Sequence, residues 1–361
     1  MSTDALVVHT VAVPDLRMGS ASWDGKSLVA EVSVGEGGSI YRLGPLETLV
    51  LDALRRRPGT PEQVQDRVED GAGVRVPRET VNGLITAFAL RGLVESTPRR
   101  IAPPPPGGLR AGPPRSAPWS GAARAAWAVA RTPVLPVLGV VGLVLAGLTL
   151  VGTVTRWAEV SAAAGGLPSL SFPRILLVVL GVVAWHMISQ VGHELCHGLA
   201  FVGLGGGRRP VLSLTFLGPI PMPSTRLDGL GLLSARWRGL VVVAAGPLFT
   251  LAFAAIPVTA VVRSPAGGAV ATWGAISLLI DLTIVILSLS PFPNTDMTRG
   301  LEILTGTRQL PIASARFRQT GRVPASLPPT TRLAVRAYPL LAIVAVSVAL
   351  TWATCLLRSL T

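Results

Sequence analysis

The chain has 361 residues, of which 49% are hydrophobic and 14% are charged, and its mean hydropathy is +0.55. This composition is typical of a membrane protein. The net charge of +13 could indicate a nucleic-acid-binding protein, but the first 95 residues carry −3 and the hydrophobic remainder carries +16. Arginines that flank membrane spans explain this pattern better, and the two cysteines give neither a disulfide framework nor a zinc-finger spacing.

The first 95 residues have the pattern of a small α+β domain with a winged-helix-like fold. Two strands at 28–34 and 39–43 are expected to form a hairpin. Three helices follow, and the second begins at Thr60 with a capping box that Gln63 completes. A short strand at 93–95 ends the domain.

A linker rich in proline and arginine, residues 96–131, leads to a membrane domain at 132–361. The arginines of the linker are expected to lie near anionic lipid headgroups. The membrane domain contains apolar stretches long enough to cross a hydrocarbon core of about 30 Å. They predict a mainly α-helical, polytopic protein with about five spans, at 132–155, 175–200, 239–262, 271–291 and 337–357.

The distribution of arginine predicts the orientation of these spans. The segment between the second and third spans contains five arginines, and the segment between the fourth and fifth contains seven. The positive-inside rule therefore predicts a multi-pass protein of the cytoplasmic membrane with its N-terminus in the cytoplasm.

The second span contains His193-Glu194-Leu195-Cys196-His197, an H-E-x-x-H pattern. Residues four apart on a helix share one face, so both imidazoles can bind a single zinc ion. Zinc lowers the pKa of a bound water towards 7, and Glu194 is placed to act as the general base. Ionisable residues within spans are costly and usually functional, so a chance match is the less favoured interpretation.

Four polar residues of this span, spaced by four, three and four, form one stripe on an otherwise apolar helix: His186, Gln190, His193 and His197. Such a stripe is expected to face protein or a wet cavity rather than lipid. His186 lies about 10 Å along the helix from His193, too far to bind the same ion. It is a candidate partner for Asp281, which lies in the middle of the fourth span.

A catalytic zinc ion usually has three protein ligands, so a third must come from another part of the chain. Asp296 is the favoured candidate, because it follows the segment Ser290 to Thr295 at the end of the fourth span, at a depth similar to that of the histidines. The prolines in that segment favour unwound backbone, which membranes tolerate where it lines a cavity. Asp228, in the loop before the third span, is the alternative third ligand.

The order of three motifs resembles that of the site-2 protease family, in particular its bacterial branch of peptide zinc metalloproteases. The motifs are the H-E-x-x-H, Ala244-Ala245-Gly246-Pro247 in the third span, and Pro291-Phe292-Pro293-Asn294-Thr295-Asp296 after the fourth. The resemblance implies that zinc is bound by His193, His197 and Asp296. It also implies that Glu194 is the catalytic base and that the protein lies in a bacterial cell membrane.

Two positions depart from the pattern of that family. The aspartate of the family usually stands in Leu-Asp-Gly, whereas Asp296 lies between Thr295 and Met297. The family often has asparagine three residues after the Gly-Pro pair, where this chain has Thr250. These positions bear on the third ligand and on how a substrate strand is held.

The N-terminal domain resembles PqqD-like domains. The resemblance rests on two segments, Tyr41 to Glu47 and Leu90 to Glu95, and on the capped second helix. Such domains recognise leader peptides of ribosomally made, modified peptides. The resemblance implies that a leader peptide adds as a strand beside the sheet. The alternatives are a DNA-binding winged helix, which the local charge of −3 disfavours, and a purely structural cap.

These features predict a zinc metalloendopeptidase that cleaves a peptide or membrane-associated precursor within the membrane, in the maturation of a ribosomally made modified peptide. Two alternatives stay open: a catalytically idle partner that escorts a peptide for export, and a regulated intramembrane protease of a single-pass protein. The expected partners are a peptide or membrane-protein substrate, a leader peptide at the N-terminal domain and the lipid bilayer. No nucleic acid is expected.

Overall fold

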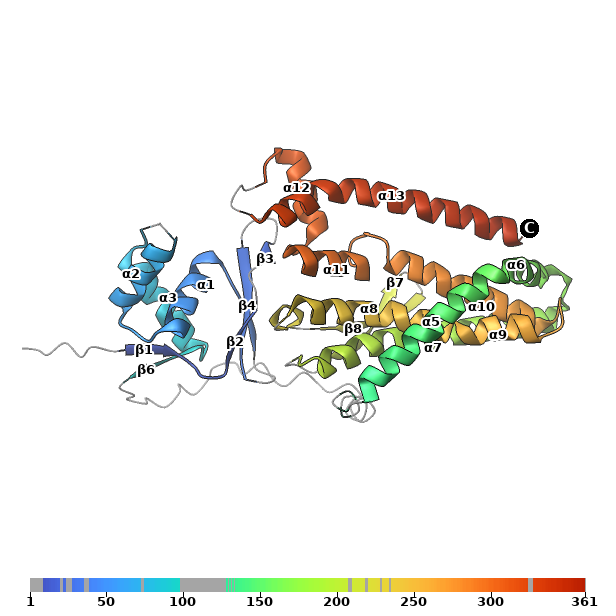
Figure 1. The fold of residues 1–361 in the computed structure, drawn as a ribbon, viewed down its shortest axis with the longest axis horizontal. Coiled ribbons are helices and arrows are strands. Elements are labelled where there is room, and N and C mark those ends of the chain that lie inside the picture. Colours follow the sequence, from blue (N-terminus) through green and yellow to red (C-terminus); the bar gives the residue numbers. More distant parts are fainter. Residues whose placement is uncertain are drawn as a thin grey trace, which may run out of the picture. The chain divides into compact units, whose positions relative to one another are not determined.

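The computed structural model describes residues 9–19, 22–23, 28–35, 39–72, 75–97, 128, 130, 132, 134–206, 210–217, 220–227, 229–233, 235–323 and 327–360. The chain divides into two compact units, Met1–Ala125 and Ala126–Thr361, whose elements are labelled in Figure 1. Each unit has its own hydrophobic core. Most of the predicted linker at 96–131 lies outside the described residues.

The N-terminal unit contains two antiparallel arrangements of strands. In the larger sheet, β4 (Leu28–Val34) pairs with β5 (Ile40–Leu43) and with two short strands, β2 (Leu16–Met18) and β3 (Ser22–Trp23). The pairing of β4 with β5 confirms the predicted hairpin.

The other two strands of the unit, β1 (His9–Ala12) and β6 (Val94–Thr97), pair with each other. The last strand was predicted, but its partner β1 was not. Neither were β2 and β3, because stretches of two to four residues are too short to show an alternating pattern.

Three helices complete this unit: α1 (Pro45–Arg56), α2 (Pro61–Ala72) and α3 (Arg78–Leu90). Thr60 and Gln63 form the predicted capping box, since the Thr60 N–H donates to Gln63 Oε1 at 3.1 Å and the Gln63 N–H donates to Thr60 Oγ1 at 3.4 Å. The helices and the sheet enclose one core, whose fully buried members include Leu43, Leu51 and Phe88.

Within the described residues, the second unit contains five segments long and apolar enough to cross a membrane. The protein is therefore a mainly helical, multi-pass membrane protein, as the sequence predicted. The segments are α5 (Val134–Thr155), α7 (Phe172–Gly203), α8 (Arg236–Phe253) continued by α9 (Ala255–Arg263), α10 (Ala269–Ser288) and α13 (Pro329–Leu360).

Three of these segments begin three or more residues before the predicted spans, α13 by eight residues and α7 and α8 by three, because an apolar stretch ends at a charged residue whereas a helix does not. Arg332 and Arg336 lie within α13, and Arg174 lies in the first turn of α7. Arginine is a good helix former, so the backbone continues through it.

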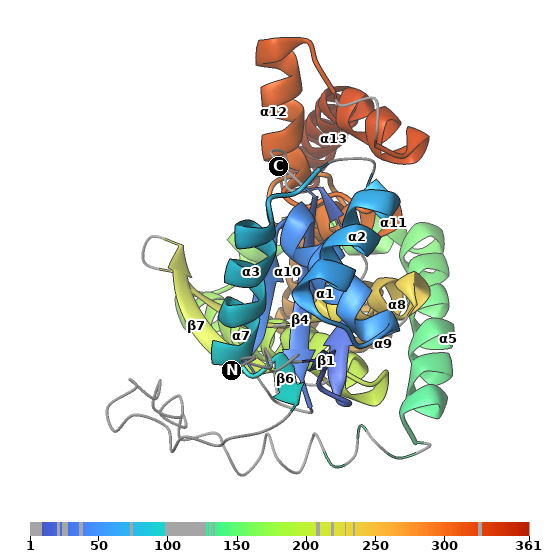
Figure 2. The same ribbon diagram turned by 90° about the vertical axis from the view of Figure 1, so that its left-hand side faces the viewer.

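Shorter elements connect the spans. They are the helices α6 (Trp157–Gly165), α11 (Asp296–Thr305) and α12 (Leu310–Thr320), the 3₁₀ turns η1 (Leu167–Ser169) and η2 (Leu230–Leu232), and a hairpin of β7 (Val211–Leu217) and β8 (Ile220–Arg226). The sequence predicted none of these. Figure 2 shows α5 beside α8, which it contacts.

Helix α7 packs against α8 and α10. Trp185 of α7 stacks on Phe253 of α8, with ring centroids 4.2 Å apart, and meets Trp273 of α10 edge-on at 5.5 Å. Gly192 of α7 faces the ring of Phe249, which leaves no room for a Cβ atom, so α7 and α8 lie close together at this level.

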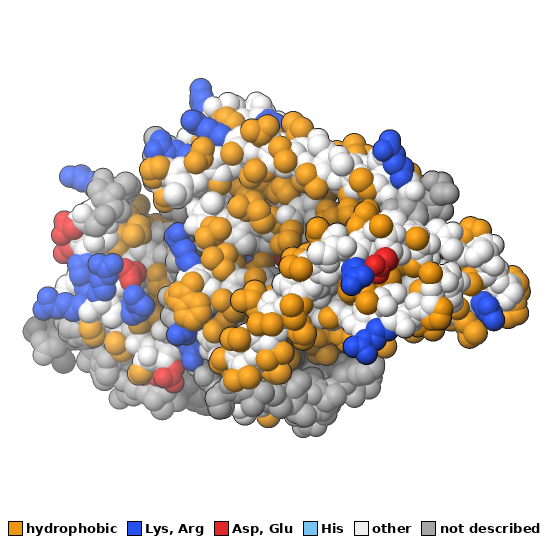
Figure 3. Space-filling model, turned by 45° about the vertical axis from the view of Figure 1, so that its right-hand side comes forward, with side chains coloured by type: hydrophobic (Ala, Val, Ile, Leu, Met, Phe, Trp, Pro, Cys, Tyr) orange, Lys and Arg blue, Asp and Glu red, His pale blue; other side chains and the backbone are white. Residues whose placement is uncertain are grey.

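The outer face of the second unit is apolar. Side chains of α5 such as Val140 and Leu148 are 63% and 62% exposed. Figure 3 shows hydrophobic side chains over much of the visible surface of the molecule. Such a surface is stable in contact with lipid tails rather than water, which agrees with the spans.

Candidate metal centre

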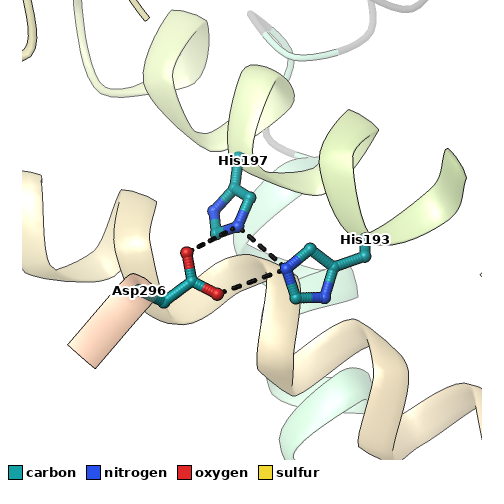
Figure 4. Close-up of side chains that lie close together, drawn as sticks. All are labelled: His193, His197 and Asp296. Carbon is teal, nitrogen blue, oxygen red and sulfur yellow. Dashed lines mark hydrogen bonds and ion pairs between the residues drawn. The ribbon is translucent and has the colours of Figure 1, made fainter. Parts of the chain in front are cut away.

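The structure brings together His193 and His197, one turn apart on α7, with Asp296, the first residue of α11 (Figure 4). The two Nε2 atoms lie 3.1 Å apart. Asp296 Oδ2 lies 3.3 Å from Nε2 of His193, and its Oδ1 lies 3.2 Å from Nε2 of His197. Both histidines are buried, and these three residues form a group that could hold a metal ion.

Hydroxyl groups fix the proline-rich turn that carries Asp296. Thr295 is the N-cap of α11, and its hydroxyl also donates to the Ser290 carbonyl at 2.6 Å. Thr298 donates to the Phe292 carbonyl, and Tyr338 of α13 donates to the Pro291 carbonyl, each at 2.6 Å. Carbonyls freed by unwinding the helix are thus satisfied by side chains, and the turn holds the carboxylate in place.

The Nδ1 atom of each histidine also has a partner. Nδ1 of His197 lies 2.7 Å from the Val242 carbonyl, which can only accept. Nδ1 of His193 lies 2.9 Å from Thr250 Oγ1, and this hydroxyl donates to the Gly246 carbonyl at 3.4 Å, so it accepts from the ring. Both rings therefore carry a proton on Nδ1, and when neutral they present a lone pair on Nε2.

The Asp296 carboxyl faces these two nitrogens. Burial would raise its pKa, but hydrogen bonds and the positive charge of protonated His193 and His197 rings lower it to about 2, so beside such rings it is ionised at neutral pH. Donation from Nε2 would require a positively charged ring, and two such rings would meet at 3.1 Å. One divalent cation held by the three side chains removes that repulsion, because both rings then stay neutral and use their Nε2 lone pairs to bind the ion.

The spacing of these atoms suits a small divalent cation. Tetrahedral ligands at the usual zinc distances of about 2.0–2.1 Å lie about 3.3 Å from one another. The two Nε2 atoms are 3.1 Å apart, and each lies 3.2 or 3.3 Å from a different oxygen of Asp296, so the carboxylate faces the pair with both oxygens at close to that spacing. Gly246 of α8 faces both Nε2 atoms so closely that a Cβ atom there would overlap them, so this position keeps the space open.

Glu194 follows the first histidine on α7 and is not a member of the ligand group. The Thr225 N–H donates to Glu194 Oε2 at 2.6 Å, and the Thr225 hydroxyl donates to the Glu194 carbonyl at 2.8 Å. Strand β8 is therefore attached to α7 beside the histidines, and it holds the glutamate carboxylate in a defined position.

The remaining predicted residues lie elsewhere. Asp228, the alternative third ligand, lies outside the described residues. The expected pairing of Asp281 with His186 is wrong. Asp281 accepts hydrogen bonds from Trp185 Nε1 at 2.8 Å and Ser189 Oγ at 3.0 Å, because these two residues share one face of α7 and His186 is turned away by about 100°.

Sequence reasoning missed three groups that organise this centre. Thr250 stood out only as a departure from a family pattern, although its spacing of four from Gly246 places both on one face of α8. The Val242 carbonyl and the Thr225 N–H are backbone groups, which every residue type at those positions except proline supplies in full, so no sequence signal marks them.

Comparisons with protein-family models, with curated proteins and with solved structures found no match to this chain. The interpretation of the centre therefore depends on its own geometry.

The first prediction concerns Gly246. Gly246→Ala should abolish stoichiometric metal binding, because the new methyl group occupies the space beside both Nε2 atoms. Alanine favours helix over glycine by about 1 kcal/mol, so folding should not suffer for backbone reasons. The measurement is bound metal per purified chain. Gly147→Ala on α5, where a Cβ atom meets nothing within 4 Å, is the control. Equal metal in both variants would contradict the site.

The second prediction concerns Thr250. Thr250→Val keeps the shape but removes the acceptor for His193 Nδ1. Loss of such an outer partner typically weakens metal affinity about 10- to 100-fold. Competition with a chelator measures this affinity. The control is Thr259→Val on α9, whose exposed hydroxyl donates to the Ala255 carbonyl one turn away. Thr250 has no role in holding the ligand if both variants bind as the wild type does.

Proposed function

We propose that the membrane unit is a zinc metalloendopeptidase that cleaves a peptide bond within the plane of the membrane. The observation that carries the proposal is the convergence of Asp296 with His193 and His197. The two histidines, with a glutamate beside the first, belong to a helix long enough to cross a membrane. Ionisable groups on a membrane-spanning helix are costly in free energy, which supports a catalytic rather than a structural use of this group.

The donor set favours zinc over other ions. Two imidazoles and one carboxylate are typical ligands of catalytic zinc, which keeps a fourth position for water or substrate. Magnesium and calcium prefer sets made of oxygen alone. The partners on both Nδ1 atoms match the outer hydrogen bonds that usually orient zinc-binding histidines.

The residues of the chain then have separate roles. Zinc, when bound, supplies a Lewis acid and makes water a nucleophile at neutral pH. Glu194 accepts the proton of the attacking water and passes it to the leaving amine. Thr225 positions the Glu194 carboxylate, and burial of the histidines excludes bulk water from the reaction.

The substrate class follows from where the site lies. A peptide or membrane-associated precursor must arrive unwound, since a helical peptide bond is covered by its own hydrogen bonds. We propose that the N-terminal unit captures a leader peptide and delivers it. Among the described strands, β5 has β4 as its one partner, so its outer edge can accept a further strand. The distribution of arginine supports a site near the cytoplasmic face of the membrane, and the family resemblance supports a bacterial membrane.

The third prediction tests the ligands and the base together. Purified wild-type protein should contain about one zinc per chain, as expected for a single three-ligand site. His197→Ala and Asp296→Ala should lose it, whereas Asp228→Ala should keep it. Glu194→Gln should keep zinc but cleave a library of unstructured peptides at least about 100-fold more slowly, because only the base is removed. Zinc content and product mass spectra are the two measurements.

Each outcome discriminates between interpretations. Zinc that depends on Asp228 instead of Asp296 would keep the protease and replace its third ligand. Cleavage by Glu194→Gln at the wild-type rate would disprove the role of the base. Wild-type protein without zinc would instead favour an escort that binds peptides without cutting them.

The fourth prediction concerns the N-terminal unit. Deleting Met1 to Glu95 should weaken capture of a leader peptide and leave zinc content unchanged, since the ligands all belong to the second unit. Crosslinking of peptide to the full and shortened chains measures capture. Unchanged crosslinking after the deletion would refute the delivery role. A separate observation would point to regulated proteolysis: a single-pass membrane protein that accumulates uncut in cells lacking this protein.

A further inference from the structure

A second feature of the membrane unit lies apart from the metal ligands. A cavity of about 460 Å³ is bounded by α12, by the first half of α13 and by the turn Pro291-Phe292-Pro293. Its walls are mainly apolar, with Pro311 from α12 and Ala342, Ile343 and Val346 from α13. Ile343 is 63% and Val346 44% exposed, so the cavity opens along the apolar surface of α13.

One face of α12 supplies a hydroxyl and a cation to the cavity. Pro311, Ser314 and Arg318 are spaced by three and four, so they form one row along the helix. Ser314 is only 1% exposed, yet its hydroxyl has no hydrogen-bond partner among the described residues. The other hydroxyls of the lining are engaged, because Tyr338 donates to the Pro291 carbonyl and Ser347 to the Ile343 carbonyl.

The charged end of the cavity can be located. The Arg336 guanidinium lies over the ring of Phe317, 5.8 Å from its centre, so the last turns of α12 lie beside the start of α13. Arg318 therefore lies at the end where α13 carries its own arginines, and the apolar residues follow further along the span. From Tyr338 to Ser347 a helix rises about 14 Å, close to half of a hydrocarbon core of about 30 Å.

We propose that this cavity binds one anionic phospholipid. The order of cation, buried hydroxyl and apolar wall matches the order of phosphate, ester carbonyl and acyl chain in such a lipid. Arg318 would pair with the phosphate, Ser314 would donate to an ester carbonyl, and the chain would lie along Ile343 and Val346. A peptide fits less well, because a single free hydroxyl cannot satisfy the N–H and C=O groups of a buried backbone.

Such a lipid would also touch the turn that carries a metal ligand. Pro291 and Phe292 line the cavity, and their carbonyls accept the hydrogen bonds from Tyr338 and Thr298 that fix the start of α11. An occupied cavity therefore supports the position of Asp296. The lipid site itself does not depend on whether the unit is a protease.

The fifth prediction tests the lipid site in the full chain. Detergent-purified protein is mixed with vesicles of equal parts phosphatidylglycerol and phosphatidylcholine, re-extracted, and analysed by native mass spectrometry. Wild-type protein should retain one phosphatidylglycerol in preference to phosphatidylcholine. Arg318→Gln should lower that retention about fivefold, because one arginine at a membrane surface contributes about 1 kcal/mol to the binding of anionic lipid. Ile343→Trp, which fills the cavity, should abolish it.

The matched control is Arg322→Gln. Arg322 is an exposed arginine just beyond α12 that does not line the cavity. The Arg322→Gln variant should therefore retain lipid as the wild type does. Equal losses in Arg318→Gln and Arg322→Gln would reduce the effect to general surface charge and overturn the proposal. It would also fail if phosphatidylcholine were retained equally, or if an apolar peptide displaced the lipid at stoichiometric amounts. Both arginines are exposed, so neither change should impair folding.

Discussion

Lipid offers no hydrogen bonds, and the packing of the membrane unit follows from the need to cover the polar face of α7. Ser189, Gln190, His193 and His197 are all buried. Helix α8 covers the two histidines with the Thr250 hydroxyl and the Val242 carbonyl, and α10 covers Ser189 with Asp281. Helix α7, which carries both histidines, therefore lies against its neighbours, while α5 and α13 present apolar side chains outward.

The same constraint makes small residues as important as polar ones. Gly192 admits the Phe249 ring, and Gly246 admits the two imidazoles, so α7 and α8 approach closely at the level of the metal centre. Pro247 lies in the same helix as Gly246 and cannot donate a backbone hydrogen bond. The Val242 carbonyl, one turn earlier, accepts from His197. The missing N–H of Pro247 would have bonded the Val243 carbonyl, so the bond from His197 is made to a neighbouring carbonyl, and the clear contribution of the Gly-Pro pair is the close packing at Gly246.

The sequence predicted the features that depend on periodicity and length. Apolar stretches located the spans, and the spacing of His193 and His197 placed both imidazoles on one face. Asp296 was harder, since its place depends on a turn fixed by Tyr338, which lies 42 residues further along the chain. The strands β1 to β3 are too short to show a pattern. The pairing of Asp281 failed because it needed the rotation of α7 to within one residue.

The distance along the chain between the two kinds of ligand has a consequence for biosynthesis. His197 and Asp296 are 99 residues apart. At about 5–20 residues per second, a ribosome needs about 5–20 s to synthesise that interval. Helix α8, which supplies the Val242 carbonyl and the Thr250 hydroxyl, ends at Phe253, 56 residues after His197, so the histidines of the newly made α7 lack this cover for about half of that time. The insertion machinery or water must shelter the histidines meanwhile, and no ion can be held by all three ligands until the carboxylate arrives.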